Sequence, residues 1–149
     1  MLTVLALLSG LTMVSLGGLT DSQRDAATAR LRTAVIHAQL WALESGRGTW
    51  VTFDVGADRA EAFVELPTAA RPRVALVDPH TRSALVVDLA ALGLGIDAVD
   101  IGGTDEVGFD AAGAPLDAAG RPLASDGAVR LTGGRLLRIA RGTGLVTVE

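Results

Sequence analysis

Cysteine is absent from this sequence of 149 residues. The chain therefore cannot form a disulfide framework, present a thiolate nucleophile or build a cysteine-ligated zinc site. Histidine is scarce as well, because only His37 and His80 occur and neither belongs to an H-E-x-x-H pattern. We expect both histidines to be solvated rather than to bind zinc.

Other signatures of catalysis are also missing. No serine lies in a G-x-S-x-G elbow, and no glycine-rich loop joins a strand to a helix in the pattern of a dinucleotide or P-loop site. We therefore expect a protein that is not an enzyme and that needs no cofactor.

Lysine is absent too, so the thirteen basic residues are all arginines, and they are spread singly with no run longer than Arg71-Pro72-Arg73. The net charge is −4 at pH 7. Such a surface lacks the clustered positive charge that binds phosphate backbones, so we expect no nucleic acid partner.

Charged residues are missing from the first twenty positions, where apolar side chains surround the predicted helix instead of forming one stripe. Twenty helical residues just cross a hydrocarbon core of about 30 Å. We interpret residues 1–20 as the transmembrane half of an N-terminal helix. A cleaved signal peptide and a buried soluble helix remain alternatives, although no basic residue precedes the apolar run. The side chains expected to face lipid or neighbouring helices are Leu2, Leu5, Leu8, Leu11 and Val14.

Residues 21–45 continue as an amphipathic helix. The apolar side chains recur at three- and four-residue spacing, and Gly46-Arg47-Gly48 provides a stop signal. The pair Gly17-Gly18 interrupts the preceding half and is a candidate hinge, because glycine weakens a helix interior. The apolar positions of this half are Ala27, Leu31, Ala34, Val35, Ala38, Trp41 and Ala42.

The remaining residues, 46–149, have the period of strands and predict a globular antiparallel β domain. We expect one hairpin from residues 49–55 and 60–66 and a second from 73–77 and 84–89. Residues 128–132, 135–140 and 145–148 predict a C-terminal meander. Residues 90–126 are rich in glycine, alanine and aspartate, and we expect loops there with one short strand at 106–110.

Two features of the β domain are candidates for binding but have ordinary structural explanations. Acidic residues cluster between Asp97 and Asp110, as a calcium loop would need, yet they lack EF-hand spacing, and we expect them to cap turns or face water. Trp41 and Trp50 bracket the end of the helix, and we expect them to anchor the helix to the sheet.

The order of the motifs resembles the H-type, FimT-like minor pseudopilins of type II secretion and type IV pilus systems. The segment from Val107 to Pro115 is similar to their F-D-x-x-G-x-P turn, and the segment from Leu137 to Val146 is similar to their closing strand, T-G turn and strand. The helix residues from Leu31 to Gly46 resemble the stretch before their first strand. The motif positions are Phe109, Asp110, Gly113, Pro115, Thr143 and Gly144.

The resemblance implies a pilin-like α+β fold, in which a long N-terminal helix packs on an antiparallel β-sheet. It also implies a structural minor subunit, inserted once in the bacterial cytoplasmic (inner) membrane with its β domain in the periplasm. The implied partners are other pilin-like subunits, contacted through the N-terminal helix, and membrane lipid. The alternative is a membrane-tethered periplasmic β domain that binds a ligand or protein without catalysis.

The sequence departs from the family pattern at its N-terminus. The resemblance implies a basic leader removed by a prepilin peptidase, which here would have to precede Met1, and a glutamate at the fifth mature position. Leu5 or Ala6 falls at that position, and the first acid is Asp21. We therefore expect either a start upstream of Met1 or a divergent member.

Overall fold

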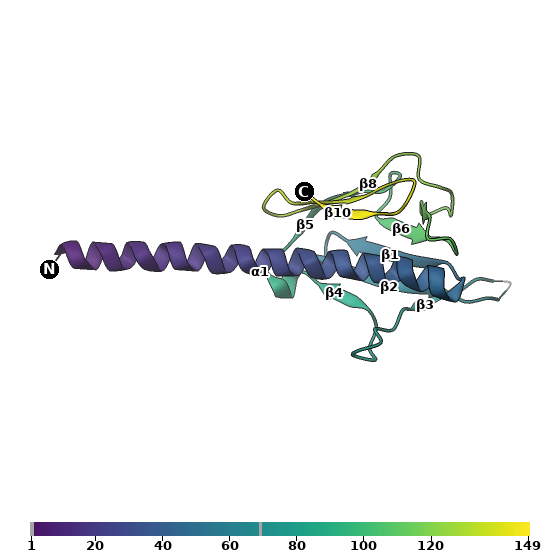
Figure 1. The fold of residues 1–149 in the computed structure, drawn as a ribbon, viewed down its shortest axis with the longest axis horizontal. Coiled ribbons are helices and arrows are strands. Elements are labelled where there is room, and N and C mark those ends of the chain that lie inside the picture. The colour runs from purple at the N-terminus through teal and green to yellow at the C-terminus, as the bar shows by residue number, and fades with distance from the viewer. Residues whose placement is uncertain (1, 69) are drawn as a thin grey trace.

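A single long helix, α1 (Leu2–Ser45), forms the spine of the molecule. The computed structural model describes residues 2–68 and 70–149, with the backbone alone for residues 2–19. The helix has 44 residues and a length of about 65 Å at 1.5 Å per residue. Its N-terminal half projects beyond the β domain, whereas its C-terminal half packs along that domain (Figure 1). Gly46, with φ at +67°, ends the helix and donates its N–H to the carbonyl of Ala42.

In the predicted membrane segment, residues 1–20, the structure describes only the side chain of Thr20. Within the part of the chain whose side chains the structure describes, no helix is both long enough and apolar enough to span a membrane.

The first sheet packs against the C-terminal half of α1. Its strand order is β3-β2-β1-β6-β7, and β4 also pairs with β2. The predicted first hairpin is confirmed, because β1 and β2 pair antiparallel from Thr49 opposite Val64 to Asp54 opposite Arg59. The six strands are β1 (Thr49–Asp54), β2 (Arg59–Glu65), β3 (Arg73–Ala75), β4 (Val86–Asp88), β6 (Glu106–Phe109) and β7 (Pro115–Leu116).

The predicted second hairpin is wrong in its pairing. Strands β3 and β4 both pair with the outer edge of β2, one after the other, instead of pairing with each other along their length. Between them, residues 77–84 leave the sheet as a small protruding loop closed by the bridge from Val77 to Ala84. Two short segments thus share one long partner, because the Asp78-Pro79 turn interrupts what would otherwise be one edge strand.

The second sheet has the order β10-β9-β8-β5. The predicted meander is confirmed in β8 (Gly127–Leu131), β9 (Leu136–Ile139) and β10 (Val146–Val148). The expectation of loops between residues 90 and 126 is wrong, because this stretch holds the short helix η1 (Ala90–Leu92), strand β5 (Ile96–Asp100) and β7 as well as β6. Strand β5 was missed because its alternation is broken by a register shift between Ile96 and Ala98, where it pairs with β8.

One continuous core joins α1 to both sheets. On the helix, six of the seven predicted apolar positions are buried, while Trp41 is half-buried at the margin. The sheets contribute the fully buried side chains of Phe53, Leu131 and Ile139, among others. The predicted fold class is therefore confirmed: a long helix packed on antiparallel sheet.

Polar contacts fix the position of the helix on the two sheets. The Thr49 hydroxyl of β1 donates to the carbonyl of Ala38 at 2.8 Å. On the side of the second sheet, the Arg32 Nε donates to the carbonyl of Val146 at 3.1 Å, and Arg135 forms an ion pair with Asp25. Both sheets are thereby tied directly to α1.

Candidate functional site

The turn between β6 and β7 is built around the carboxylate of Asp110. Its Oδ1 accepts hydrogen bonds from the backbone N–H groups of Ala112 and Ala114, both at 2.9 Å. The backbone N–H of Asp110 in turn donates to the carbonyl of Ala114 at 3.0 Å. The expectation that this acid caps a turn is confirmed, because its oxygen satisfies two N–H groups that the turn leaves without a strand partner.

The same turn occurs twice in succession, which the sequence reasoning missed. Residues 109–115 (FDAAGAP) and 116–122 (LDAAGRP) form a seven-residue repeat. In the second copy, Asp117 Oδ1 accepts from the N–H groups of Ala119 and Arg121 at 2.9 Å. The glycines of the two copies have φ of +75° and +77°, and each proline lies opposite the first residue of its copy. A search for short internal repeats would have found this signal.

The second turn also contains a charged pair. Arg121 Nε lies 3.0 Å from Asp117 Oδ2, and a terminal guanidinium nitrogen lies 2.9 Å from it. The pKa of Asp117 is lowered, first by the hydrogen bond from the backbone N–H of Arg121 and then by the Arg121 side chain, against an opposing effect of desolvation.

Gln39 of α1 connects the first of these turns to the turn between β9 and β10. Its Nε2 donates to the carbonyl of Gly113 at 2.9 Å and to the carbonyl of Thr143 at 2.8 Å. A Cβ on Gly144 would lie 2.5 Å from Gln39 Nε2 and 3.1 Å from the ring of the buried Phe109, so only glycine fits there. The motif residues of the two turns therefore meet around one helix side chain, which the sequence analysis did not single out.

The remaining predicted sites are not brought together. The side chains of Leu2, Leu5, Leu8, Leu11 and Val14 lie outside the described part of the chain. The backbone of Gly17 and Gly18 continues within α1, and their role as a hinge stays a prediction.

The histidines differ from each other. His80 is exposed, as expected, but His37 is half-buried with its Nε2 covered and without a hydrogen-bond partner in the described chain, so the expectation that it is solvated was wrong. Within the described residues no group of three potential metal ligands occurs. Of the clustered acids, Asp100 accepts a hydrogen bond from the N–H of Gly103, and Glu106 pairs with Arg73.

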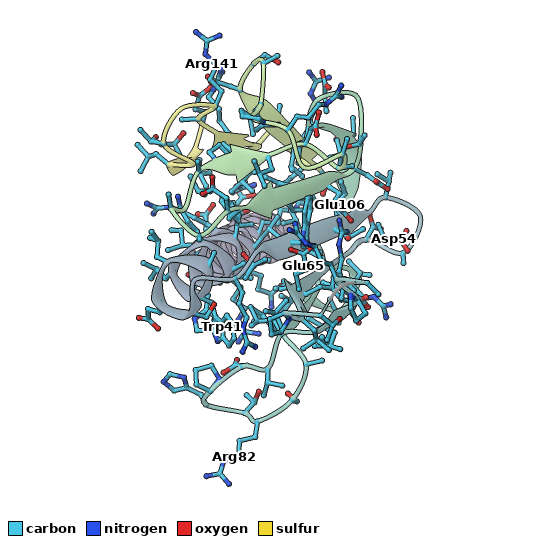
Figure 2. The ribbon with its side chains drawn as sticks, turned by 90° about the vertical axis from the view of Figure 1, so that its right-hand side faces the viewer. Trp41, Asp54, Glu65, Arg82, Glu106 and Arg141 are labelled. Atoms are coloured by element: carbon cyan, nitrogen blue, oxygen red, sulfur yellow. The ribbon has the colours of Figure 1, made fainter. Side chains whose placement is uncertain are left out.

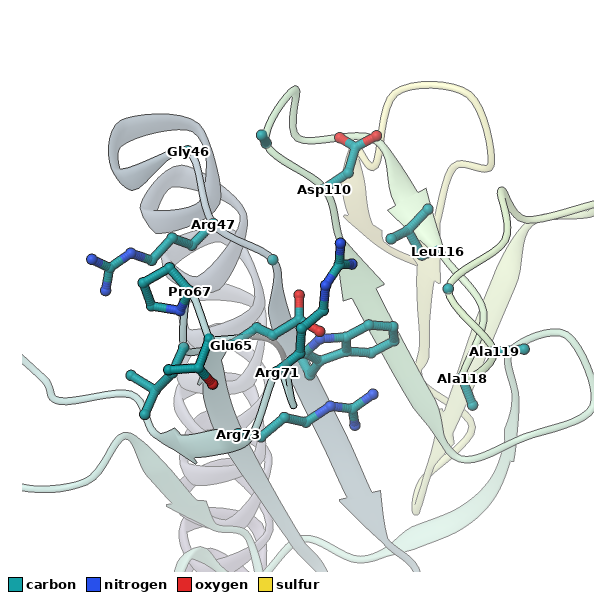
Figure 3. Close-up of a pocket in the computed structure, with 16 residues that line it drawn as sticks. Gly46, Arg47, Glu65, Pro67, Arg71, Arg73, Asp110, Leu116, Ala118 and Ala119 are labelled. Atoms are coloured by element: carbon teal, nitrogen blue, oxygen red, sulfur yellow. The ribbon is translucent and has the colours of Figure 1, made fainter.

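A groove with a volume of about 870 Å³ lies at the C-terminal end of α1. One wall follows the end of the helix and the loop from β2 to β3, and the other wall is formed by the two tandem turns. Figure 3 shows the space between them. Its lining residues include Gly46, Arg47, Gly48, Trp50, Glu65, Arg71, Arg73, Asp110, Leu116 and Ala119.

The floor of this groove is the indole of Trp50, which is 5% exposed. Its ring lies directly over Gly108 of the neighbouring strand, where a Cβ would approach the ring to 2.5 Å. The Arg73 guanidinium stacks on the other side, 3.8 Å from the ring centroid, and bonds to Glu106 at 2.6 Å. Trp50 therefore does not anchor the helix as expected, because it lies on the face of β1 opposite the helix.

The groove carries charges of both signs. In Figure 3 the side chains of Arg71 and Arg73 extend into the space between the walls, whereas Arg47 points away from it. Arg73 is already paired with Glu106. Within the described chain, the side chains of Arg71 and Glu65 take part in no hydrogen bond or ion pair. The groove thus offers one free guanidinium donor and one free carboxylate acceptor.

Comparison with known proteins found similar proteins by structure alone. No family model and no curated protein matches the sequence. Among solved structures, the chain is similar to the minor pseudopilin EpsH from the type 2 secretion system of Vibrio cholerae, with a TM-score of 0.62 at 12% identity over 85% of this chain and 94% of that one. It is also similar to the type IV minor pilin FimU of Pseudomonas aeruginosa, with a TM-score of 0.56 at 15% identity over 84% of this chain and 91% of that one.

A second crystal form of FimU gives the same result, with a TM-score of 0.54 at 14% identity over 87% of this chain and 90% of that one. These structures establish the fold: the chain has the architecture of minor pseudopilins and minor pilins. The resemblance predicted from the order of the sequence motifs is confirmed at that level.

Proposed function

We propose that this protein is a structural minor subunit of a type II secretion or type IV pilus-like assembly in the cell envelope. The observation that carries the proposal is the form of α1, whose C-terminal half is packed in the β domain while its N-terminal half projects from it (Figure 1). A projecting helix without a charged residue in its first twenty positions needs lipid or other helices to cover it.

The proposed location is the cytoplasmic membrane of a bacterium, crossed once by residues 1–20, with the β domain in the periplasm. Other pilin-like subunits would contact the N-terminal helix, where close packing rather than the hydrophobic effect selects partners inside lipid. A prepilin peptidase is a further partner if a leader precedes Met1. The subunit acts by assembly and not by catalysis, which agrees with the use of its motif residues in turns.

Crosslinking tests this proposal cleanly because the chain has no cysteine of its own. A Leu11→Cys variant, expressed in the native host and treated with a short thiol crosslinker, should yield covalent products with other pilin-like subunits, identified by mass spectrometry. The matched control is Arg82→Cys, since Arg82 lies at the end of the protruding loop in Figure 2. Its crosslinks should be absent or different.

The same experiment can be done with Leu5→Cys and Leu8→Cys. If none of the three cysteine variants crosslinks to a pilin-like protein, the filament proposal is wrong. The membrane-tethered binding domain would then replace it, because the groove beside Trp50 gives that alternative a specific observation in its favour.

The proposed hinge at Gly17 and Gly18 belongs to the same assembly. Replacing both glycines by alanine should raise helix content there, since each glycine costs about 1 kcal/mol relative to alanine in a helix interior. We expect circular dichroism of the variant in detergent to show more helix and pull-down assays to show impaired assembly. Unchanged assembly would show that the helix needs no bend at this point.

A further inference from the structure

We propose that the groove at the end of α1 binds an extended acidic segment of a partner protein. Arg71 would hold a carboxylate of that segment, and Glu65 would accept one of its backbone N–H groups. This inference goes beyond the role in assembly and does not depend on it.

The free charges of the groove select a polypeptide as the occupant. A guanidinium without a carboxylate partner is a strong, directional donor to a carboxylate. Arg71 is such a group, because Figure 3 shows it extending into the groove and it has no ion pair within the described chain. A phosphate backbone would also bring negative charge close to Glu65 and Asp110, which lie in the same lining. An acidic peptide carries negative charge only at its acidic side chains, and its backbone N–H groups can donate to Glu65, which a phosphate backbone cannot do.

The backbone of Arg71 supports a functional reason for arginine at this position. Its φ is +44°, a region in which a residue with a Cβ is disfavoured and glycine or asparagine is the usual choice. Observed strain of this kind is a reason to look for a function of the side chain. Here the loop conformation directs the guanidinium toward the space that the tandem turns enclose on the other side.

The size and place of the groove agree with a segment of another protein. About 870 Å³ is near the upper end of the range for ligand sites. It begins at Gly46, directly after the end of α1, so it lies at the opposite end of the helix from the N-terminus. A partner can therefore reach it while the N-terminal half of α1 is covered by lipid or by other helices.

Trp50 provides a direct signal of binding, because it forms the floor of the groove and the chain has only two tryptophans. In a Trp41→Phe background, indole fluorescence comes from Trp50 alone. We would titrate the full chain, in non-ionic detergent at physiological salt, with a blocked octapeptide of alternating serine and glutamate. The same peptide with glutamine in place of glutamate is the ligand control.

The variant that tests Arg71 is Arg71→Gly, since glycine adopts positive φ more readily than arginine and the loop should keep its shape. The matched control is Arg82→Gly, because Arg82 also has positive φ, +55°, and lies on the protruding loop away from the groove. We expect saturable binding of the glutamate peptide, weakened about tenfold or more by Arg71→Gly and unchanged by Arg82→Gly.

A further variant, Glu65→Ala, separates a peptide site from a general anion site. It should weaken peptide binding because an acceptor is lost, whereas a site for anions would bind a short single-stranded oligonucleotide more tightly once the carboxylate is removed. The proposal is overturned if the glutamate peptide does not bind, if the glutamine peptide binds equally well, if both arginine variants lose affinity alike, or if the oligonucleotide binds more tightly than the peptide. None of these results affects the crosslinking of the N-terminal helix.

Discussion

The pairing of Trp50 with Gly108 shows how a small residue can define a surface. The indole lies flat on the neighbouring strand because position 108 has no side chain, and Arg73 then covers the ring from the other side. This arrangement buries a large aromatic side chain on the face of the sheet that lies away from the helix. It also leaves the indole Nε1 without a hydrogen-bond partner in the described chain.

We expect Gly108→Ala to destabilise the protein by about 1 to 3 kcal/mol, the usual effect of overpacking, because the new Cβ would lie within 2.7 Å of three ring carbons. Gly142→Ala is the matched control, since nothing lies within 4 Å of the added Cβ there. Urea unfolding of both variants measures the difference. Equal stability of the two variants would show that Trp50 moves aside freely.

The lowered pKa of Asp117 predicts a dependence of stability on pH. Its folded pKa lies below the unfolded value, so the carboxylate stabilises the fold above the unfolded pKa, and this contribution is lost as pH falls through the folded pKa. We expect Asp117→Asn to be less stable than the wild type near neutral pH and to approach it as the pH falls below about 4. Urea midpoints between pH 7 and pH 2.5 provide the measurement.

The control for this titration is Asp97→Asn, because Asp97 is exposed and its side chain makes no contact with a donor in the described chain. Its urea midpoint near neutral pH should match that of the wild type. If the difference in urea midpoint between the wild type and Asp117→Asn stays constant down to pH 2.5, the Asp117 carboxylate does not stabilise the fold through its charge.

At the scale of elements, the helices and strands that could be predicted from the sequence are the ones with a regular apolar pattern. The C-terminal half of α1, the first hairpin and the C-terminal meander each have a clear period. Strand β5 has no such pattern, since Asp97 and Ala98 are both exposed and its pairing depends on β8, some thirty residues later. Long-range pairing of this kind leaves no local signal, which is why the second sheet was predicted with one strand too few.

The contact of α1 with the turns is equally hidden from sequence, because a glutamine on a helix is usually solvated. We expect Gln39→Ala to destabilise the protein by about 1 to 3 kcal/mol, since it leaves the carbonyls of Gly113 and Thr143 without this donor. Gln23→Ala, at an exposed position of the same helix, should change stability little. Thermal melting of both variants distinguishes a structural contact from a solvated side chain.

If the two glutamine variants melt at the same temperature, water replaces the Gln39 contacts at little cost. The two turns would then hold their positions through Asp110 and the strand pairing alone.

At the scale of the whole molecule, the β domain depends on only part of α1. Ala27 is the first buried apolar residue in the described part of the helix, and the ion pair between Asp25 and Arg135 lies near it. The groove could not be predicted from the sequence, because its walls come from the segments around residues 46, 71 and 119, which only the folded sheet brings together. Its free arginine was visible in the sequence only as one scattered cation among thirteen.

We expect deletion of Met1 to Thr20 to leave a soluble and folded domain, because every buried apolar side chain in the described chain lies beyond the deletion. Circular dichroism should show the strands and the shortened helix, and the melting transition should remain cooperative. An insoluble or unfolded product would mean that the first half of α1 contributes to the fold of the domain.

The rigid attachment of α1 has a mechanical consequence. Hydrogen bonds and an ion pair with Thr49, Val146 and Arg135 attach the C-terminal half of the helix to the β domain. The other half extends beyond the domain for about 30 Å. If the attached half tilted by about 10° relative to the β domain, the N-terminal end of a straight helix would move by about 5 Å, roughly the rise of one helical turn. A small repacking around these three contacts would therefore displace the N-terminal end of a straight helix much further than it displaces the β domain itself.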